Sequence, residues 1–248
     1  MSELEVVLRQ GYFLEYSPTN KKSKHRFCGE HNIKGADCPN CDKPLHRFAS
    51  LDLNDKKIEI PIQGITKLHI LYCWRCNVAQ DDFFYKLIGD EEIEILEYGR
   101  GIEQTPIFFQ SLNEKDKEYW LKKLNEIDFP YKNYPDFFPG AGISLKKIPK
   151  RIQEYLVRFN SDGDFDPDRD HEARQYDIPK HQIGGEPYLV QCDYTPSKCP
   201  ECQVKMPLLA TIGDDCLDER GFGGNTYAQV IYGMCVKCKI ISAYQQCD

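Results

Sequence analysis

The sequence lacks any long apolar run. No stretch approaches the ~20 apolar residues that a membrane-spanning helix needs, which excludes a helical membrane protein. The first residues, MSELEVVLRQGYF, also lack the basic start and the apolar segment of a secretory signal peptide. We therefore expect a cytoplasmic protein with no membrane partner.

A basic excess is missing as well. The 248 residues include 39 acidic and 32 basic side chains, so the net charge is −7. Proteins that follow nucleic-acid phosphates usually carry a basic excess or stripe. The one dense basic run, residues 21–26, lies in a polar stretch typical of a solvated loop, although a nucleic-acid contact there stays open as an alternative. Nucleic acid is therefore a disfavoured partner.

Catalytic motifs are absent too. No Ser-His-Asp or Cys-His-Asn arrangement is readable, and His69 alternates with apolar residues, as a packed or surface strand residue does. The glycine-rich run at residues 221–225 lacks the Lys-Ser/Thr of a phosphate-binding loop. We therefore predict that the protein is not an enzyme.

An acidic stretch runs from Asp162 to Asp170, where every second residue is an aspartate. It is not an EF-hand calcium loop, because Pro167 and Ala173 stand where that loop needs Gly and Glu. We predict an acidic linker, with a weak cation site or a contact surface for a basic partner as alternatives.

Cysteine, by contrast, is abundant. Eight of the twelve cysteines form CxxC pairs, grouped as Cys38, Cys41, Cys73, Cys76 and as Cys199, Cys202, Cys235, Cys238. The pairs are separated by 31 residues in the first group and 32 in the second. In a chain of this length without a secretory signal, such pairs favour a metal over disulfides. The other four, Cys28, Cys192, Cys216 and Cys247, are predicted to be free thiols.

Each group already supplies four thiolates, which close the tetrahedral shell of Zn²⁺. A catalytic zinc keeps one position open for water or substrate, so we predict two structural Zn²⁺ ions per chain. A redox CxxC would need a thioredoxin-like context that the sequence does not offer. Metal sharing between the two groups is the other alternative, and the near-equal spacing favours pairing within each group.

The run from Cys28 to His31 is a CxxH that precedes the first pair. It could add a partial third metal site. Because no second pair accompanies it, we interpret it as a loop cysteine and a surface histidine.

The chain between the paired motifs has the pattern of β-strands. In the first group, residues 48–53 and 68–72 flank a polar turn at residues 54–57. In the second group, residues 207–212 lead away from the first CxxC and residues 226–234 lead into the second. Antiparallel pairing of two such strands places the CxxC turns side by side, which is the layout of a zinc ribbon.

We predict an α+β, mostly β fold: a duplicated, two-lobed antiparallel sheet architecture with a zinc ribbon in each lobe and a few helices between them. The expected lobes are residues 1–110 and 181–248. Residues 111–180 are expected to form a helical connection and the acidic linker. Its first helix, residues 111–127, has Ser111 as N-cap, and a second helix covers residues 148–159.

The C-terminal run carries a resemblance. It contains HQIGGEPY from His181, the CPEC pair, LLATIGD from Leu208, GGNTY from Gly223 and a terminal YQQC. These segments resemble the YwqG-like family of uncharacterised bacterial proteins. The chain is also similar to the programmed-cell-death-protein-like and Tsr4-type chaperones, which carry paired CxxC knuckles and escort a ribosomal protein. The resemblance implies pseudo-symmetric β lobes that bind a protein rather than perform chemistry.

We therefore predict a zinc-binding intracellular protein-interaction module, of a chaperone-like or immunity-like adaptor type. An acidic protein gains electrostatic steering toward a basic protein partner. Two alternatives stay open: a nucleic-acid-binding zinc-ribbon protein, and an enzyme whose site lies between the lobes.

Overall fold

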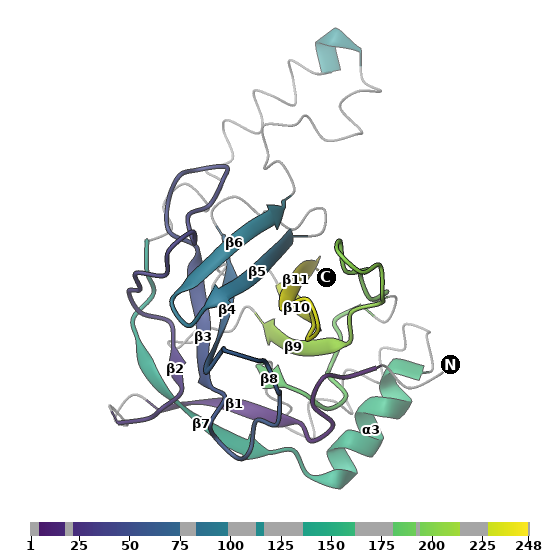
Figure 1. Ribbon diagram of the computed structural model, residues 1–248. Helices are drawn as coiled ribbons and strands as arrows, with labels where there is room; N and C mark the ends of the chain where they lie inside the picture. Colours follow the sequence, from purple (N-terminus) through teal and green to yellow (C-terminus); the bar gives the residue numbers. More distant parts are fainter. Residues whose placement is uncertain are drawn as a thin grey trace.

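The computed structural model describes residues 5–17, 22–74, 83–98, 113–116, 136–161, 181–191, 194–213 and 228–247. In these residues the chain is mostly β, as expected. A single antiparallel sheet is built from eleven described strands in the order β4-β3-β2-β7-β1-β8-β9-β10-β11-β5-β6. The sheet curls, so that β5 and β6 return toward β4 at the opposite end of the strand order (Figure 1). In the described part of the chain, no helix is long and apolar enough to cross a membrane.

The strands are β1 Tyr12–Ser17, β2 Arg26–Phe27, β3 His46–Asp52, β4 Lys67–Tyr72, β5 Phe83–Gly89, β6 Glu92–Glu97, β7 Ala141–Lys147, β8 Gln182–Ile183, β9 Leu208–Gly213, β10 Ala228–Cys235 and β11 Ile240–Cys247. The strands predicted on either side of the CxxC pairs are confirmed as β3, β4, β9 and β10. Within the segment expected to be helical and acidic, residues 141–147 form the strand β7 instead.

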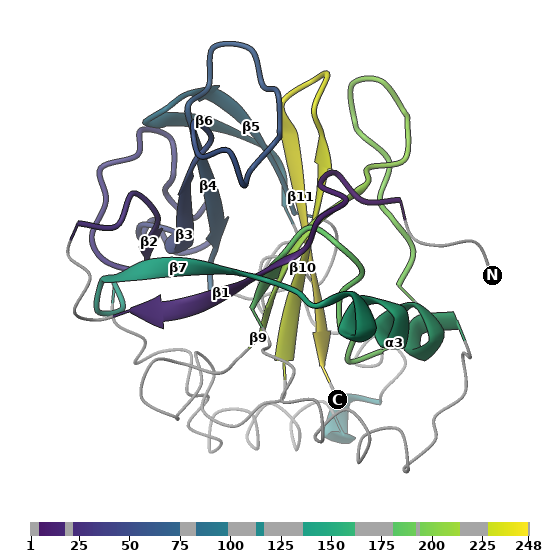
Figure 2. The same ribbon diagram turned by 90° about the horizontal axis from the view of Figure 1, so that it is seen from below.

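Helix α3, Lys150–Ser161, confirms the second predicted helix. It buries Ile152, Leu156 and Phe159 in a cluster that also contains Phe13 of β1, and Figure 2 shows it beside the sheet. Of the first predicted helix, only residues 113–116 are described. There Asn113 Oδ1 accepts the N–H of Asp116 at 3.1 Å, as an N-cap side chain does. The predicted N-cap, Ser111, lies outside the described residues.

The main core is aromatic and lies inside the curl. Phe48 of β3, Tyr72 of β4 and Trp74 are each at most 1% exposed. The Tyr72 and Trp74 rings meet edge to face with centroids 5.2 Å apart. Burying side chains of this size stabilises the fold by about 1.5–3 kcal/mol each. The core therefore sits directly beside the strand that leads into Cys73.

The strand pairs β3–β4 and β9–β10 have the same register. Ala49 pairs with Ile70 and Leu51 with Leu68; Ala210 pairs with Tyr232 and Ile212 with Val230. Each residue of β3 in these pairs therefore corresponds to a residue of β9 that lies 161 positions later. Each residue of β4 corresponds to a residue of β10 that lies 162 positions later. The ladder skips one residue in each case, Phe48 in β3 and Leu209 in β9, so even the bulge is repeated.

The likeness extends to the neighbouring strands. Phe27 of β2 pairs with Ala49, as Ile183 of β8 pairs with Ala210. The next strand in each case comes from the other part of the chain: β2 pairs with β7, and β8 pairs with β1. β1 and β7 then pair with each other in the middle of the sheet. β1 thus extends the part of the sheet that contains β8, β9 and β10, and β7 extends the part that contains β2, β3 and β4.

The hairpin β5–β6 departs from this pattern. After the second CxxC of the C-terminal group, β11 turns back and pairs with β10. At the corresponding place β5 does not pair with β4; it pairs with β11 instead. The β5–β6 hairpin, which follows the first CxxC group in the chain, therefore pairs with β11, the strand that follows the second CxxC group.

Candidate metal centres

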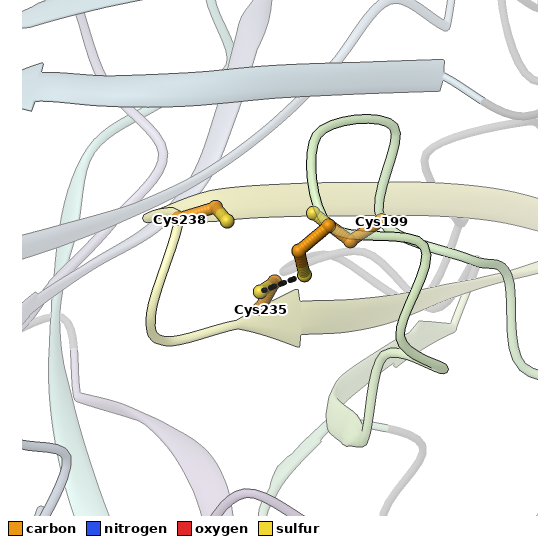
Figure 3. A group of neighbouring side chains, drawn as sticks. Cys199, Cys235 and Cys238 are labelled. Carbon is orange, nitrogen blue, oxygen red and sulfur yellow. Dashed lines mark hydrogen bonds between the residues drawn. The ribbon is translucent and has the colours of Figure 1, made fainter.

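The C-terminal thiols converge in one place. The Sγ atoms of Cys199, Cys202, Cys235 and Cys238 all lie within 4.8 Å of one another. Cys235 ends β10 and Cys238 lies in the following turn, and both approach the loop that carries Cys199 (Figure 3). This brings together every residue predicted for the second site.

Three of the four predicted ligands of the first site also converge. The Sγ atoms of Cys38, Cys41 and Cys73 lie within 4.8 Å of one another. Cys76 lies outside the described residues. Among the described residues, these two are the only groups of three or more His, Cys, Asp or Glu side chains with metal-ligand spacing.

Sulfur spacing tests whether a zinc ion fits. A tetrahedron with metal–sulfur bonds of about 2.3 Å has sulfur–sulfur edges of about 3.8 Å. Across the paired motifs, Cys41 Sγ lies 3.9 Å from Cys73 Sγ, and Cys202 Sγ lies 3.6 Å from Cys235 Sγ. Both distances are far longer than the ~2.05 Å of a disulfide. The thiols therefore have the spacing of metal ligands.

The first CxxC turn of each site has the same backbone hydrogen bonds. Cys38 N–H donates to Lys43 O at 2.7 Å, and Asp42 N–H donates to Cys38 O at 2.9 Å. In the second site, Cys199 N–H donates to Val204 O at 2.9 Å and Gln203 N–H to Cys199 O at 2.8 Å.

The residue after each turn adopts a left-handed conformation that side chains rarely accept. The φ angle is 53° at Asp42 and 61° at Gln203. The turns are thus held by their own backbone and present two thiols each, so a metal ion has only to join one turn to the other.

Burial differs within each centre. Cys38, Cys73 and Cys199 are completely buried, whereas Cys41 and Cys202 are only partly so. Phe84, Met206 and Ile240 pack around the second centre. Apolar packing around a closed set of four thiolates restricts access of water or substrate to the metal, which suits a structural ion.

Without a metal, the thiols of the second centre differ in pKa. A hydrogen bond from the backbone N–H of Val204 lowers the pKa of Cys202 to about 7. Burial raises the pKa of Cys235 and of Cys238. A metal must therefore displace protons from these thiols, so its affinity falls as the solution becomes more acidic.

Cys28 and His31, for which a partial metal site was the alternative interpretation, belong to neither group of possible metal ligands in the described residues. Cys28 is buried and forms no disulfide with another described residue, and its carbonyl oxygen accepts from Arg47 Nη2 at 2.8 Å. His31 Nε2 lies 2.7 Å from Leu45 O, and burial lowers the pKa of its ring. Both residues contribute to the loop that leads to the first CxxC pair.

His69 is packed in the core, which was one of the two interpretations of its place in the sequence; the other was a surface strand residue. The residue is 1% exposed, its Nε2 lies 2.6 Å from Asp90 O, and its Nδ1 lies 2.9 Å from the Ser50 hydroxyl. Donation to Asp90 O leaves Nδ1 as the acceptor, so Ser50 donates to it. Ser50 and His69 are directly opposed in the β3–β4 ladder, which makes this pair a buried cross-strand bridge.

The acidic run from Asp162 to Asp170 and the glycine-rich run at residues 221–225 lie outside the described residues. So do Cys192 and Cys216.

Sequence reasoning missed a second repeated motif. HRFCGE starts at His25 and HQIGGE at His181, so histidine, glycine and glutamate recur 156 residues apart. Both copies end a short strand with two consecutive left-handed residues, Cys28–Gly29 in one and Gly184–Gly185 in the other. Aligning the two halves from their CxxC pairs back toward the N-terminus, with a five-residue gap, would have found it.

Comparison of the chain with protein-family models, with curated proteins and with solved structures yields no match.

Proposed function

We propose that the protein is a zinc-braced protein-interaction module with two structural Zn²⁺ ions. Cys38, Cys41, Cys73 and Cys76 would hold one ion, and Cys199, Cys202, Cys235 and Cys238 the other. The observation that carries the proposal is the sulfur spacing of 3.9 Å and 3.6 Å between CxxC turns that are far apart in sequence. Four thiolates would leave no open position, so each ion braces the fold instead of activating water.

We propose further that the two ribbons arose by duplication and form the two lobes expected from the sequence. The repeated register, bulge and CxxC-turn hydrogen bonds support a duplication. β1, from the N-terminal lobe, pairs with β8 of the C-terminal lobe, and β7, from the connection between the lobes, pairs with β2 of the N-terminal lobe. The lobes would therefore be intertwined, and the sheet of each would be completed by chain from outside that lobe.

The proposed role is that of a chaperone-like or immunity-like adaptor for a basic protein. The net charge of −7 supports a basic partner, since opposite charge speeds encounter and disfavours nucleic acid. Acidic side chains also line exposed parts of the described sheet, such as Glu94 and Glu97 of β6.

Metal analysis tests the first part. Protein purified without added metal should contain about two Zn²⁺ per chain, and its eight paired thiols should resist alkylation until a chelator is added. A protein with no bound metal, or with iron in place of zinc, would contradict the proposal.

Affinity capture tests the partner. The zinc-loaded chain should retain basic proteins at low salt and release them as salt rises. A charge-matched acidic protein of similar size serves as the control. Retention of RNA or DNA with a steep salt dependence, and of no specific protein, would favour the nucleic-acid alternative.

A further inference from the structure

We propose that the two metal centres are energetically coupled through the β5–β6 hairpin, so that metal at either centre raises the metal affinity of the other. The inference rests on the proposed zinc function. It adds a mechanism by which the protein becomes fully braced only when both ions are bound.

One side of the hairpin holds the chain that leads to the first centre. Lys34, four residues before Cys38, donates its N–H to Glu91 O at 2.9 Å and accepts the N–H of Ile93 at 2.9 Å. The next residue, Gly35, lies against β6 so closely that any side chain there would overlap the carbonyl oxygen of Ile93. The position of Cys38 is therefore tied to the hairpin.

The hairpin also holds β4, which leads into Cys73. The Asp90 carboxylate, at the tip of the hairpin, accepts the N–H groups of Thr66 at 2.6 Å and Lys67 at 3.0 Å. The Tyr85 hydroxyl takes the place of a missing backbone partner, since it accepts from Leu71 N–H at 3.2 Å and donates to His69 O at 2.8 Å. Both halves of the first thiol set are thus anchored on the same hairpin.

The same hairpin contacts the second centre. Lys86 Nζ lies 2.6 Å from Glu201 Oε1, and Glu201 stands between Cys199 and Cys202. Leu87 N–H donates to the carbonyl oxygen of Lys239, the residue after Cys238, at 2.9 Å. Phe84 of β5 and Leu96 of β6 pack in the apolar cluster that contains all four cysteines of this centre.

These contacts make the hairpin a shared support. Loss of metal from the second centre leaves its two turns unjoined, so the anchors at Glu201 and Lys239 lose their fixed positions. A less ordered β5–β6 hairpin then holds Lys34 and β4 less firmly, and the first centre must be ordered at the cost of its own binding energy. Coupling between sites is reciprocal and is typically 5–150-fold in affinity.

Site-resolved alkylation tests the coupling directly. The zinc-loaded full-length chain is mixed with a chelator and a thiol reagent, and mass spectrometry follows Cys38 and Cys41 separately from Cys199 and Cys202. The double variant Cys235→Ser, Cys238→Ser removes the second centre. We expect Cys38 and Cys41 to be alkylated about tenfold faster in this variant than in the wild type. An unchanged rate at these two thiols would overturn the proposal.

Milder variants cover the case in which the double variant fails to fold. Lys86→Ala removes the ion pair with Glu201 and leaves every thiol in place. We expect it to speed alkylation in both centres by about twofold to fivefold, whereas Lys150→Ala, which breaks the exposed Lys150–Glu154 pair on α3, should change neither. Faster alkylation of Cys199 and Cys202 alone, or no change at either centre, would contradict the coupling.

A second pair of variants tests whether a change at the first centre affects the second centre. Gly35→Ala should force the first loop off β6 and speed alkylation of Cys199 and Cys202 as well as Cys38 and Cys41. Gly64→Ala is the control, because Gly64 has nearly the same φ, 77° against 78°, with no atom within 4 Å of the new methyl group. An effect of Gly35→Ala confined to the first centre would refute the proposal. Two zinc ions released independently would refute the coupling and leave the zinc function standing, whereas a chain without zinc would refute both.

Discussion

His25 and His181 accept equivalent backbone hydrogen bonds at the ends of β3 and β9. Nδ1 of His25 accepts the N–H of Asp52, the last residue of β3, at 3.1 Å. Nδ1 of His181 accepts the N–H of Gly213, the last residue of β9, at 3.2 Å. Each ring thus satisfies a backbone donor where a ladder ends, at positions 156 residues apart. Neither histidine belongs to a metal centre, so the repeat is a property of the fold and not only of the cysteines.

Replacing His25 with Ala should destabilise the zinc-loaded protein by about 2 kcal/mol, because the Asp52 N–H loses its acceptor and the ring is 4% exposed. Urea unfolding followed by tryptophan fluorescence measures the change. Lys24→Ala is the control, since its side chain is exposed and its distance to Asp52 is 3.9 Å. Equal unfolding midpoints for His25→Ala and wild type would show that the contacts of the ring with Asp52 and Asp55 contribute nothing to stability.

The strands on either side of the CxxC pairs were predictable from the sequence. In each group a strand leaves one CxxC turn and another enters the second turn, so β3, β4, β9 and β10 follow from short-range pattern alone. Apolar residues recur at helical spacing in α3, so the sequence predicted both ends of this helix to within two residues.

The pairing of distant strands was not predictable. β1 pairs with β7 and β8, and β5 leaves β4 to pair with β11, although no local signal distinguishes these partners. Strand propensity reflects the surface on which a strand packs and does not name its neighbour. The strand β7, AGISLKK, was missed for a related reason: it follows a Pro- and Phe-rich stretch, is short, and is exposed at its last two residues.

Asp90 should make stability depend on pH in the acidic range. Burial acts to raise the pKa of its carboxyl, but hydrogen bonds from Thr66 and Lys67 outweigh burial and lower the pKa below its usual value. A lowered folded pKa stabilises the protein above the unfolded pKa of about 4, and this contribution is lost as the pH falls through the folded pKa.

Because solvent screens this largely exposed carboxylate, Asp90→Asn should be less stable than wild type by about 0.5–1 kcal/mol at pH 7, with the difference shrinking below about pH 4. Urea unfolding of both proteins at each pH, in the same metal state, gives the difference. Glu15→Gln changes an exposed carboxylate that pairs with Lys146 and should have little effect at either pH. A difference that stays constant with pH would mean that the charge of Asp90 is unimportant.

Removal of zinc should unfold much of the sheet, because metal binding and folding share one free energy. A strong chelator is expected to abolish the near-ultraviolet circular dichroism of the packed core around Trp74, and added Zn²⁺ should restore it. Acidification should release zinc as well, since protons compete for the thiolates. Retention of the native spectrum by metal-free protein would show that the preformed CxxC turns hold the fold without an ion.

Two buried tyrosines offer a matched comparison of a bonded and an unbonded hydroxyl. Tyr85 and Tyr232 are both 0% exposed, but their hydroxyls differ. The Tyr85 hydroxyl bridges Leu71 N–H and His69 O, whereas the Tyr232 hydroxyl has no hydrogen-bond partner among the described residues. Tyr85→Phe removes the bridge between β5 and the edge of β4 that pairs with no other described strand. It should cost about 1–3 kcal/mol, because two buried backbone groups are left unsatisfied.

Tyr232→Phe removes a hydroxyl that is buried at a cost, so it should be neutral or stabilise the protein by up to about 1 kcal/mol. Both variants keep the ring and therefore the packing, which isolates the hydroxyl. Chemical denaturation of the zinc-loaded proteins ranks the two. Equal losses of stability in the two variants would mean that β5 is held against β4 by packing of the Tyr85 ring and not by its hydroxyl. A loss confined to Tyr85→Phe would make this hydroxyl the polar bridge that holds the hairpin against the strand leading to Cys73.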